Sequence, residues 1–491
     1  MDRRLFIGVD LGSTNMKAGV YDAENFQCLA SAAAPVPYDR RFGVEIDLEQ
    51  LENLLLEMLR EIAAAENVEG SQIEEIGLTG QAETLVILDK EGKPLMNAIS
   101  WMDERSKEEC AELERKFTAE ICEQVTGQQA ISPTWPATKI LWLRKKRPDI
   151  FEKAAYYMLL KDYIVYRLTG KMLADCSIAT FSFYFDIYKK CYWKEMLEAI
   201  GIREEQLPQL TEPCTEAGWM AKEIAEMIGV PESVKVNVGT LDHFAGMIGT
   251  GNTEPGIVSL STGTVMALAT LARKPRRGET YGIAMHYGFQ ADTYVMLPVA
   301  ESGGVSLEWF RKTCMPDMDY ENLNRKLETR TSDSGIIFLP YLVGTNAPEF
   351  DVQAKGIFYG LRAEHDAVDM AKAVMEGVGF VLKKNCEGIE KAGMPIHHIY
   401  ATGGGTRSQI WCQIQADITG IPIVVLKEKE IGCLGAAVLA AVAAGACVSY
   451  KEAAKQVHKE SICYMPKKSA AIEEKYRKFG ILYQTMLEIE K

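Results

Sequence analysis

The sequence predicts an α/β protein of two lobes with a cleft between them, and three observations support this. First, 491 residues are too many for one ordinary core and fit two domains of about 200 residues or slightly more. Second, residues 6–22, FIGVDLGSTNMKAGVYD, predict strand, glycine turn and strand, and residues 256–270, GIVSLSTGTVMALAT, repeat the pattern. Third, residues 397–425 predict a strand, three glycines, an amphipathic helix and another strand.

The turn of the first hairpin has the composition of a phosphate site. Gly12 lets the backbone approach a phosphate closely, while Ser13 and Thr14 add donors without bulk. Asp10, at the end of the first strand, would place a carboxylate where a phosphate-bound Mg²⁺ is held, directly or through water. An ordinary hairpin with a polar turn explains this one segment equally well.

The second hairpin changes that balance, because Thr262 and Gly263 repeat the same chemistry in the other half of the chain. Two such hairpins suggest related lobes that grip a polyphosphate from opposite sides. The pattern resembles the actin, hexokinase and heat-shock ATPase fold, whose lobes are ribonuclease H-like. The sequence contains neither the G-x-x-x-x-G-K-[ST] phosphate loop nor the set of protein-kinase motifs.

Composition narrows the class of protein. With 54 Lys and Arg against 68 Asp and Glu, the net charge of −14 argues against a nucleic-acid or anionic-membrane surface. Twelve cysteines without a C-x-x-C pair predict reduced thiols in a cytoplasmic protein. A strand begins almost at once, so we expect no signal peptide. Residues 431–450 carry no charge, but they are rich in Ala and Gly, which favours a closely packed buried helix over a membrane span.

The next segments predict a core-facing helix and then a possible pocket. The helix after Asp47, its expected cap, has one apolar face formed by Leu48, Leu51, Leu55, Met58 and Ile62. A strand then ends at residues 79–80, and polar residues at the end of a buried strand are where α/β proteins place ligands. The pocket candidates are Gln81, Glu83, Trp101, Asp103 and Arg105. Taken singly, each of them is more often a surface or capping residue.

Further along, the Pro-rich loop 133–136 leads into a helix, and Trp135 would either close a pocket or pack beneath the loop. Residues 161–170 predict a helix that ends at Gly170. Residues 234–238 alternate as a strand, and Asp242 stands just before a short helix of small residues. The positive helix end favours an ionised carboxylate there. Such an anion orients an acceptor hydroxyl and takes its proton during phosphoryl transfer, although a helix cap is the simpler role for Asp242 alone.

These segments, in this order, resemble the FGGY family of carbohydrate kinases over essentially the whole chain. Residues 356–361, GIFYGL, followed after seven residues by residues 369–376, DMAKAVME, agree with the second signature of the family. Residues 136–143, PATKILWL, nearly meet the first, with Thr134 in place of an aromatic or small residue.

The resemblance implies ATP and Mg²⁺ as cofactors and assigns roles to single residues. It implies that the metal and phosphates are contacted by Asp10, Gly12, Ser13, Thr14, Thr262 and Gly263. Gly404, Gly405 and Ser408 would contact adenosine. Asp242 would be the general base and a second metal contact. The sugar or polyol pocket would be lined by Gln81, Ala82, Glu83, Trp101, Asp103 and Asp242. We expect lobes at residues 1–241 and 242–491, with the helix from about residue 470 packing back on the first lobe.

Departures from the family fall where the substrate is selected. Xylulokinases usually have Gln-Met-His and glycerol kinases Gln-Arg-Glu-Thr where this chain has Gln81, Ala82, Glu83 and Thr84, and His243 follows Asp242 where small or amide residues are common. Since Ala82 leaves space, we expect a xylulose-like ketose or polyol of five or six carbons. Glycerol kinase is the alternative, and a nucleotide-switched actin- or chaperone-like binding protein is the alternative of another class. We expect no nucleic acid or membrane partner and allow for a homodimer.

Overall fold

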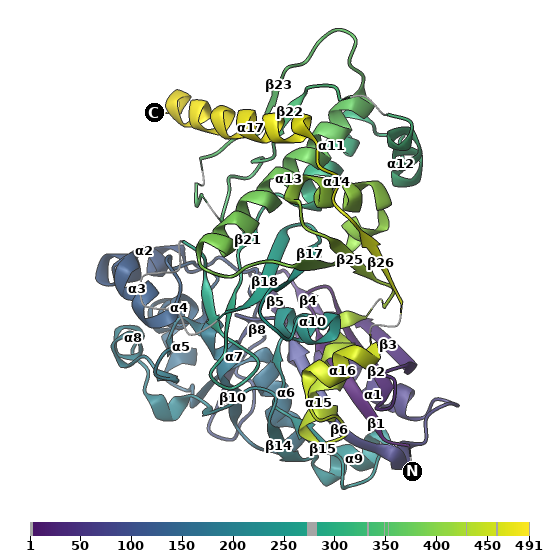
Figure 1. Ribbon diagram of the computed structural model, residues 1–491. Coiled ribbons are helices and arrows are strands. Elements are labelled where there is room, and N and C mark those ends of the chain that lie inside the picture. The colour runs from purple at the N-terminus through teal and green to yellow at the C-terminus, as the bar shows by residue number, and fades with distance from the viewer. Residues whose placement is uncertain are drawn as a thin grey trace.

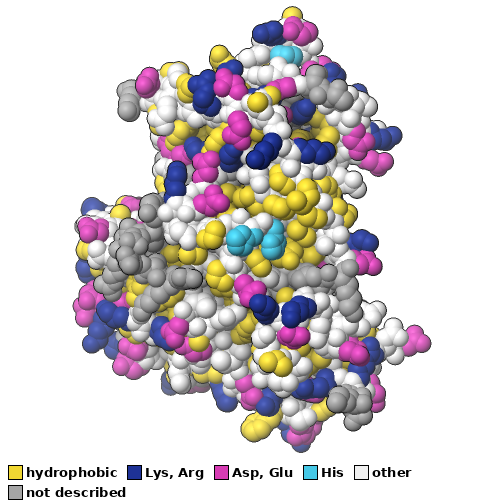
Figure 2. All heavy atoms as spheres, viewed as in Figure 1, with side chains coloured by type: hydrophobic (Ala, Val, Ile, Leu, Met, Phe, Trp, Pro, Cys, Tyr) yellow, Lys and Arg dark blue, Asp and Glu magenta, His cyan; other side chains and the backbone are white. Residues whose placement is uncertain are grey.

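The computed structural model describes residues 3–272, 282–330, 333–347, 349–351, 353–428, 430–457 and 460–490. Figure 1 shows two bodies, with the N-terminus at the bottom of the lower one and the C-terminus at the top of the upper one. On the face seen in Figure 2, acidic and basic side chains are interspersed, and hydrophobic side chains gather around its middle, beside histidines. Charges of both signs are thus mixed over the described part of this face.

The lower body is organised on a mixed sheet in the order β14-β15-β6-β1-β2-β3, with β16 beside β6. Its strands are β1 Leu5–Leu11, β2 Asn15–Asp22, β3 Cys28–Pro35, β6 Ile73–Gly80, β14 Glu216–Trp219, β15 Lys235–Asn237 and β16 Thr240–Leu241. β1 is antiparallel to β2 and parallel to β6, and Asp10 stands beside Thr79 in the register. Nearly all of β1 is buried, as a central strand covered on both faces requires.

The upper body repeats this plan in the order β19-β20-β18-β17-β24-β25-β26, with β21 beside β18. Its strands are β17 Ile257–Thr262, β18 Met266–Ala272, β19 Met285–Tyr287, β20 Tyr294–Met296, β21 Val299–Ala300, β24 His398–Thr402, β25 Ile423–Leu426 and β26 Ser461–Tyr464. β17 is antiparallel to β18 and parallel to β24. Both predicted hairpins are therefore present, each at the centre of its own sheet.

Smaller sheets and helices surround these two. A five-stranded sheet in the order β4-β5-β8-β7-β9 consists of β4 Tyr38–Asp39, β5 Glu45–Ile46, β7 Leu85–Leu88, β8 Ala98–Ile99 and β9 Tyr156–Leu159. Three further sheets have two strands each: β10 Leu173–Asp175 with β13 Gln209–Thr211, β11 Phe185–Asp186 with β12 Cys191–Tyr192, and β22 Ile337–Leu339 with β23 Ile357–Tyr359. The helices are α1 Leu48–Ala63, α2 Lys107–Lys116, α3 Ala119–Thr126, α4 Pro136–Lys146, α5 Pro148–Phe151, α6 Leu160–Thr169, α7 Cys176–Ala179, α8 Lys194–Ile200, α9 Lys222–Ile228, α10 Asp242–Thr250, α11 Gly304–Cys314, α12 Tyr320–Glu328, α13 Ala367–Lys391, α14 Gln409–Thr419, α15 Ile431–Ala443, α16 Tyr450–Val457 and α17 Ala470–Ile489.

Local sequence signals set the ends of several helices as predicted. Asp47 caps α1, because its side chain accepts the backbone N–H of Gln50 at 3.0 Å. The five apolar residues predicted for the inner face of α1 are all buried. Gly170 ends α6 in the left-handed conformation, with φ of 74°.

One helix, α15, departs from the predicted division at residue 242. α15 packs against β1, β6 and α10, so residues 431–443 return to the lower body (Figure 1). Small residues permit this close approach: a Cβ at Gly8 or Gly77 would overlap a carbonyl oxygen of α15, and one at Gly435 would overlap the carbonyl oxygen of Ala245. The buried helix expected in this region is present, but it ends at Ala443.

The final helix does not pack as predicted either. α17 lies against β22, α13 and α14 at the top of Figure 1, and its Phe479, Tyr483 and Met486 join the apolar core of the upper body. It therefore covers the second lobe. Within the described residues, none of the helices combines the length and the apolar character that crossing a bilayer would require.

Candidate active site

A cavity of about 590 Å³ lies where the two bodies meet. Six of the predicted site residues line it, namely Ser13, Gln81, Ala82, Glu83, Trp101 and Asp242. The upper body contributes residues that follow β17, including Val265 and Ala267, and residues near β21, including Val299 and Glu301. Both halves of the chain therefore form this cavity.

A smaller cavity, of about 210 Å³, adjoins the first. Asp10 lines it from the end of β1, and Ser259, Ser261 and Thr402 line it from β17 and β24 of the other sheet. Asp242 and His243 line both cavities. The beginning of α10 is thus the place where the two cavities meet.

The turn of the first hairpin is held by hydrogen bonds to its carbonyl groups. The carbonyl of Gly12 accepts Nε2 of Gln81 at 3.1 Å, and that of Ser13 accepts the hydroxyl of Tyr38 at 2.7 Å. The carbonyl of Thr14 accepts a backbone N–H at 3.0 Å. These bonds fix a turn whose Ser13 faces the larger cavity, and Gln81 serves as one of its supports.

Asp10 has an unusual environment for a carboxylate. Its Oδ1 is buried and has no hydrogen-bond partner among the described residues. Burial, and then the charge of Asp242, raise the pKa of Asp10 to about 7, whereas Lys17 lowers it. Lys17 stands opposite Asp10 in the hairpin and pairs with Glu430 at 2.6 Å. A buried carboxylate oxygen that lacks a partner fits a role as ligand of a cation.

The small number of carboxylates in this region fits a cation that is held mostly by water and phosphate oxygens. The described residues contain no cluster of three or more His, Cys, Asp or Glu able to hold a metal. Asp10 and Asp242 nevertheless line one cavity together. One or two carboxylates, completed by water and phosphate oxygens, are what Mg²⁺ takes in phosphoryl-transfer sites.

Asp242 is the first residue of α10, and the residue at the cap position is Leu241. The cap role considered from the sequence is therefore wrong. Oδ1 of Asp242 accepts the backbone N–H of His243 at 2.6 Å. Burial raises the pKa of Asp242 above its ordinary value, although the charge of His243 and its N–H act to lower it. The predicted ionising effect of the helix end is thus outweighed by desolvation.

The second hairpin and the glycine turn form one unit. Oγ1 of Thr262 donates to the carbonyl of Thr402 at 2.8 Å. Gly403 has a φ of 90°, and a Cβ there would lie 2.8 Å from the carbonyl oxygen of Thr262. The carbonyl of Gly263 accepts the N–H of Gly304 at the start of α11, also at 2.8 Å. The turn of β17 and β18 is thereby fixed between the glycine turn and α11.

Two residues predicted to contact adenosine, Gly404 and Ser408, differ in their surroundings. A Cβ at Gly404 would meet nothing within 4 Å, so the space beside this backbone is open. Ser408, in contrast, caps α14: its Oγ accepts the N–H of Trp411 at 3.3 Å and donates to Oδ1 of Asn324 at 2.7 Å. Its hydroxyl therefore serves as a cap of α14, and its predicted contact with adenosine stays a prediction.

Glu83 lines the larger cavity from a strained backbone, with φ of 62°. Burial raises its pKa, and both the charge of Lys139 and a hydrogen bond with Thr134 oppose that change. Nζ of Lys139, itself fully buried, donates to the carbonyl of Glu83 at 3.1 Å and to that of Ser100 at 2.8 Å. Lys139 therefore ties together the two loops that carry Glu83 and Trp101.

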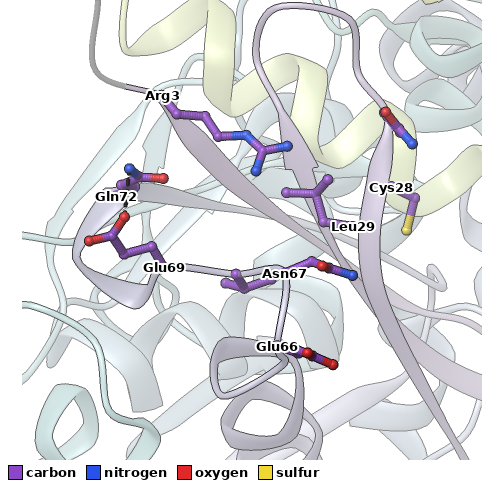
Figure 3. Close-up of a pocket in the computed structure, with 9 residues that line it drawn as sticks. Arg3, Cys28, Leu29, Glu66, Asn67, Glu69 and Gln72 are labelled. Atoms are coloured by element: carbon purple, nitrogen blue, oxygen red, sulfur yellow. Dashed lines mark hydrogen bonds between the residues drawn. The ribbon is translucent and has the colours of Figure 1, made fainter.

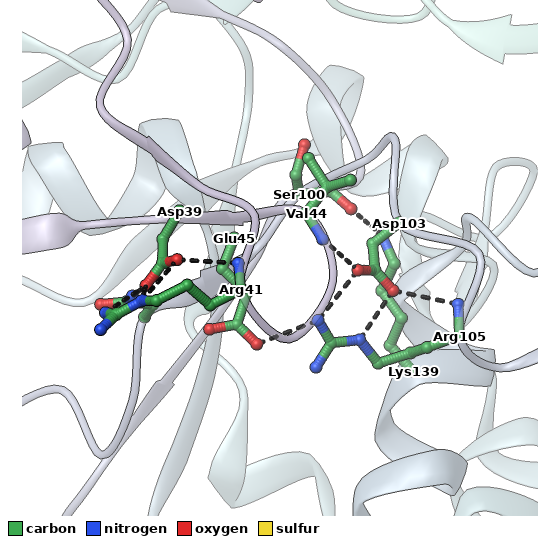
Figure 4. Close-up of polar contacts among 9 residues, drawn as sticks. Asp39, Arg41, Val44, Glu45, Ser100, Asp103, Arg105 and Lys139 are labelled. Carbon is green, nitrogen blue, oxygen red and sulfur yellow. Dashed lines mark hydrogen bonds and ion pairs between the residues drawn. The ribbon is translucent and has the colours of Figure 1, made fainter.

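Asp103 does not line the cavity, and this corrects its predicted place in the sugar pocket. Figure 4 shows its carboxylate bound to Arg105, with Nε to Oδ1 at 2.7 Å, and to the N–H of Val44 at 2.6 Å. Glu45 completes the cluster, pairing with Arg105 at 2.9 Å. Asp103 and Arg105 thus fix the loop after β4 to the loop after β8.

Several lining residues were missed by the sequence analysis. His286 is buried, stacks on Phe181 with ring centroids 4.3 Å apart, and lies within 3.3 Å of Nε2 of Gln128. Burial, with the charge of His243, lowers the pKa of His286 to about 3. Nothing in the sequence around these three residues marks them. Ser259 and Ser261 could have been found from the sequence, because they lie two residues apart in β17 and therefore share one face of that strand, opposite to the face of Thr262.

The structure also contains a wider hollow away from this region. It has a volume of about 770 Å³ and lies between β3, the end of α1 and the following turn (Figure 3). Its one arginine, Arg3, is already bonded to Asp22 at 2.5 Å. None of the predicted site residues lines it. Size alone therefore does not identify the site, and the convergence of side chains on the two cavities does.

Comparisons with known proteins cover nearly the whole chain. The model of the FGGY family of carbohydrate kinases, N-terminal domain, matches residues 5–249, and that of its C-terminal domain matches residues 257–444. A xylulose kinase of Bacillus subtilis is 29% identical over 482 residues, which cover 98% of this chain and 96% of that protein. A glycerol kinase of Thermococcus gammatolerans is 29% identical over 92% of this chain and 91% of its own. The crystal structure of a ligand-bound xylulose kinase from Lactobacillus acidophilus has a TM-score of 0.88 at 27% identity and covers 99% of this chain and 97% of that one.

Proposed function

The chain belongs to the FGGY family of carbohydrate kinases, and we propose that it transfers the γ-phosphoryl group of ATP to a hydroxyl of a five- or six-carbon ketose or polyol, with xylulose the best candidate. The observation that carries this proposal is the position of Asp242, which lines both adjoining cavities. One cavity has room for an acceptor, and the other has hydroxyls and a carboxylate suited to phosphates and a cation.

In this proposal Asp242 is the general base. The acceptor lies in the larger cavity beside Gln81, Ala82, Glu83 and Trp101. The carboxylate of Asp242 orients the acceptor hydroxyl and takes its proton as the new O–P bond forms and the bond to the leaving ADP oxygen breaks. The raised pKa of Asp242 supports this role, because a carboxylate with a higher pKa is a stronger base.

The remaining predicted residues hold ATP. The phosphates are assigned to Gly12, Ser13 and Thr14 of one turn and to Thr262 and Gly263 of the other, and adenosine to Gly404 and Gly405. We propose Mg²⁺ as the divalent cation that the family implies, held by Asp10 and Asp242. When bound, it neutralises charge on the transferring phosphoryl group. The partnerless Oδ1 of Asp10 supports that assignment.

The choice of acceptor class is supported by the charge and size of the larger cavity. Three carboxylates, those of Glu83, Asp242 and Glu301, line it, and no Lys or Arg lies among the described lining residues. Carboxylates accept hydrogen bonds from neutral hydroxyls and repel an anionic sugar acid. The small side chain of Ala82 leaves space for an acceptor larger than glycerol.

We further propose a cytoplasmic enzyme whose two lobes close on ATP and the sugar. Closure excludes water, so that the phosphoryl group reaches the sugar and ATP is not hydrolysed. The lobes are assigned to residues 1–241 and 242–491, with α15 and α16 returned to the first lobe. Neither a nucleic acid nor a membrane is required as partner, and a homodimer is compatible with this site because one chain lines both cavities.

A coupled assay of ADP release across a panel of acceptors tests the proposed function. The panel contains xylulose, ribulose, fructose, xylitol, glycerol and gluconate, each with MgATP. We expect the highest kcat/KM for a ketose or polyol of five or six carbons and little turnover of gluconate. A preference for glycerol would establish the alternative kinase. Steady ADP release independent of every acceptor would contradict the kinase proposal and favour a nucleotide-switched binding protein.

A further inference from the structure

A fully buried lysine, Lys161, binds the backbone just before the proposed base. Lys161, in the first turn of α6, has no exposed surface. Its Nζ donates to Oδ1 of Asp162 at 2.8 Å and to the carbonyl of Val238 at 2.6 Å, and it pairs with Oδ2 of Asp175 at 2.8 Å. Two of the three donors of the ammonium are thus hydrogen-bonded, and Asp175 adds an ion pair. Because an isolated buried charge is strongly unfavourable, these three partners keep Lys161 in one position.

The first arm of this cluster holds the chain that leads to Asp242. Val238 precedes Asp242 by four residues, and its carbonyl is the one that Lys161 binds. The next residue, Gly239, has a φ of 75°, and a Cβ there would overlap the carbonyl oxygen of Leu78. The strand end is therefore pressed directly against β6, and only glycine fits.

The second arm runs through the side chain of Asp175. Its Oδ1 caps α7 by accepting the N–H groups of Ser177 at 2.9 Å and Ile178 at 3.1 Å, and it also accepts the hydroxyl of Ser177. Oγ of Ser177 lies 2.7 Å from Oγ1 of Thr240, which stands two residues before Asp242. A continuous polar chain thus connects Lys161 to β16, the strand that leads directly into α10.

A third contact completes the support of this segment. Oγ1 of Thr79 donates to the carbonyl of Thr240 at 2.9 Å, and β16 pairs with the end of β6. The N–H, carbonyl and hydroxyl groups just before Asp242 are therefore fixed on several sides by buried partners. Buried polar contacts on several sides restrict the backbone to one position.

We propose that Lys161 and Asp175 are positioning residues for the proposed base, holding the backbone of residues 238–241 so that the carboxylate of Asp242 faces the acceptor. They act through Asp242 and touch neither substrate. The proposal rests on the function proposed above. Its physical ground is that a displacement of about 1 Å at a reacting group costs on the order of 100-fold in rate.

The alternative is that Lys161 contributes only to folding, and a matched buried pair elsewhere separates the two. Lys475 of α17 is also buried, and its Nζ binds Oε2 of Glu376 on α13 at 2.7 Å. Neither residue lines the cavities described above. Lys161→Met and Lys475→Met therefore remove similar charges, but only the first change loosens the segment before Asp242.

The experiment measures kcat, the KM for ATP and the unfolding temperature of Lys161→Met, Ser177→Ala and Lys475→Met, at a temperature where each variant is folded. We expect kcat to fall about 10- to 100-fold in Lys161→Met and several-fold in Ser177→Ala, with the KM for ATP within about twofold. Lys475→Met should lower the unfolding temperature and leave kcat unchanged. Ser177→Ala removes one hydroxyl, so it provides the test if Lys161→Met does not fold.

A double variant shows whether the effect passes through the base. In a background of Asp242→Asn, Ser177→Ala should cause no further loss of kcat, because a positioning effect disappears with the group that is positioned. Wild-type kcat in both Lys161→Met and Ser177→Ala would overturn the proposal. So would a loss of kcat on adding Ser177→Ala to Asp242→Asn that equals the loss Ser177→Ala causes in the wild type. If Asp242→Asn itself retains wild-type kcat, the failure lies instead in the proposed function.

Discussion

At the scale of single residues, Glu83 is the side chain that most directly tests the acceptor pocket. It lines the larger cavity, and burial raises its pKa. Whether its carboxyl group is ionised therefore depends on the groups that it contacts. Glu83→Gln should raise the KM for the preferred ketose about tenfold or more, since a hydrogen bond to a charged group contributes about 1.5–3 kcal/mol. The KM for ATP should not change. Both constants come from the same ADP-release assay.

Asp103→Asn is the matched control for that change. Asp103 is bonded to Arg105 and to the backbone of Val44 and does not line the cavity. We expect it to lower the unfolding temperature while leaving the KM for the ketose close to wild type. If Asp103→Asn raises that KM as much as Glu83→Gln does, the structural assignment of Asp103 is wrong.

His286 gives a prediction about the pH dependence of stability. Its pKa is lowered by burial to about 3 in the folded protein, against 6.5 in the unfolded chain. Between these pH values the unfolded state binds a proton that the folded state does not. The free energy of unfolding of the wild type therefore decreases as the pH falls. The free energy of unfolding of the wild type, relative to His286→Gln, should decrease by about 1 kcal/mol from pH 6 to pH 5. Urea unfolding at both pH values measures it, and a constant difference would refute the buried neutral state.

The sequence predicted which of several residues would lie together, while their roles stay predictions. Asp10, Ser13, Glu83, Trp101 and Asp242 all line the two adjoining cavities. Prediction from sequence failed for Asp103 because an Asp two residues before an Arg in a loop looks the same whether the pair faces a ligand or another loop. It could not find His286, since only the fold brings β19 beside Gln128 and Phe181.

At the scale of elements, the fit of α15 against its neighbours is open to test. A Cβ at Gly435 would overlap the carbonyl oxygen of Ala245 on α10, whereas one at Gly480 in α17 would meet nothing within 4 Å. Gly435→Ala should therefore destabilise the protein by about 1–3 kcal/mol through overpacking. Gly480→Ala should stabilise it by up to about 1 kcal/mol, because alanine has the higher helix propensity. Thermal unfolding of the two variants measures both, and equal stabilities would contradict the close packing of α15.

The elements themselves were largely predictable, but their partners were not. The two hairpins, α1 with its Asp47 cap and the end of α6 at Gly170 follow from local periodicity, capping and glycine. The return of α15 to the first sheet does not, because a helix of small apolar residues is compatible with burial in either lobe. Similarly, the apolar stripe of α17 shows that it packs, but the stripe does not specify the surface that it covers.

At the scale of the whole molecule, the site depends on both lobes. The smaller cavity takes Asp10 from one sheet and Ser259, Ser261 and Thr402 from the other. If closure around both substrates creates the reactive state, ADP release without an acceptor should be below about 1% of the rate with one, because an open cleft does not align water with the phosphate. The assay with MgATP alone measures this rate. Hydrolysis at a rate close to that of transfer would contradict closure as a requirement.

The central claim is that one carboxylate at the junction of the lobes takes the proton of the acceptor while the two hairpins hold the phosphates. Replacing Asp242 by Asn keeps the shape of the side chain and removes both its basicity and its charge, and the Kd for MgATP separates the loss of the base from any loss of the cation. The direct measurement is kcat for the preferred acceptor together with the Kd for MgATP in Asp242→Asn. We predict that kcat falls by at least about 10³, while the Kd for MgATP rises by a much smaller factor because Asp10 and the two hairpins still hold the cation and the phosphates. A near-wild-type kcat would contradict the account.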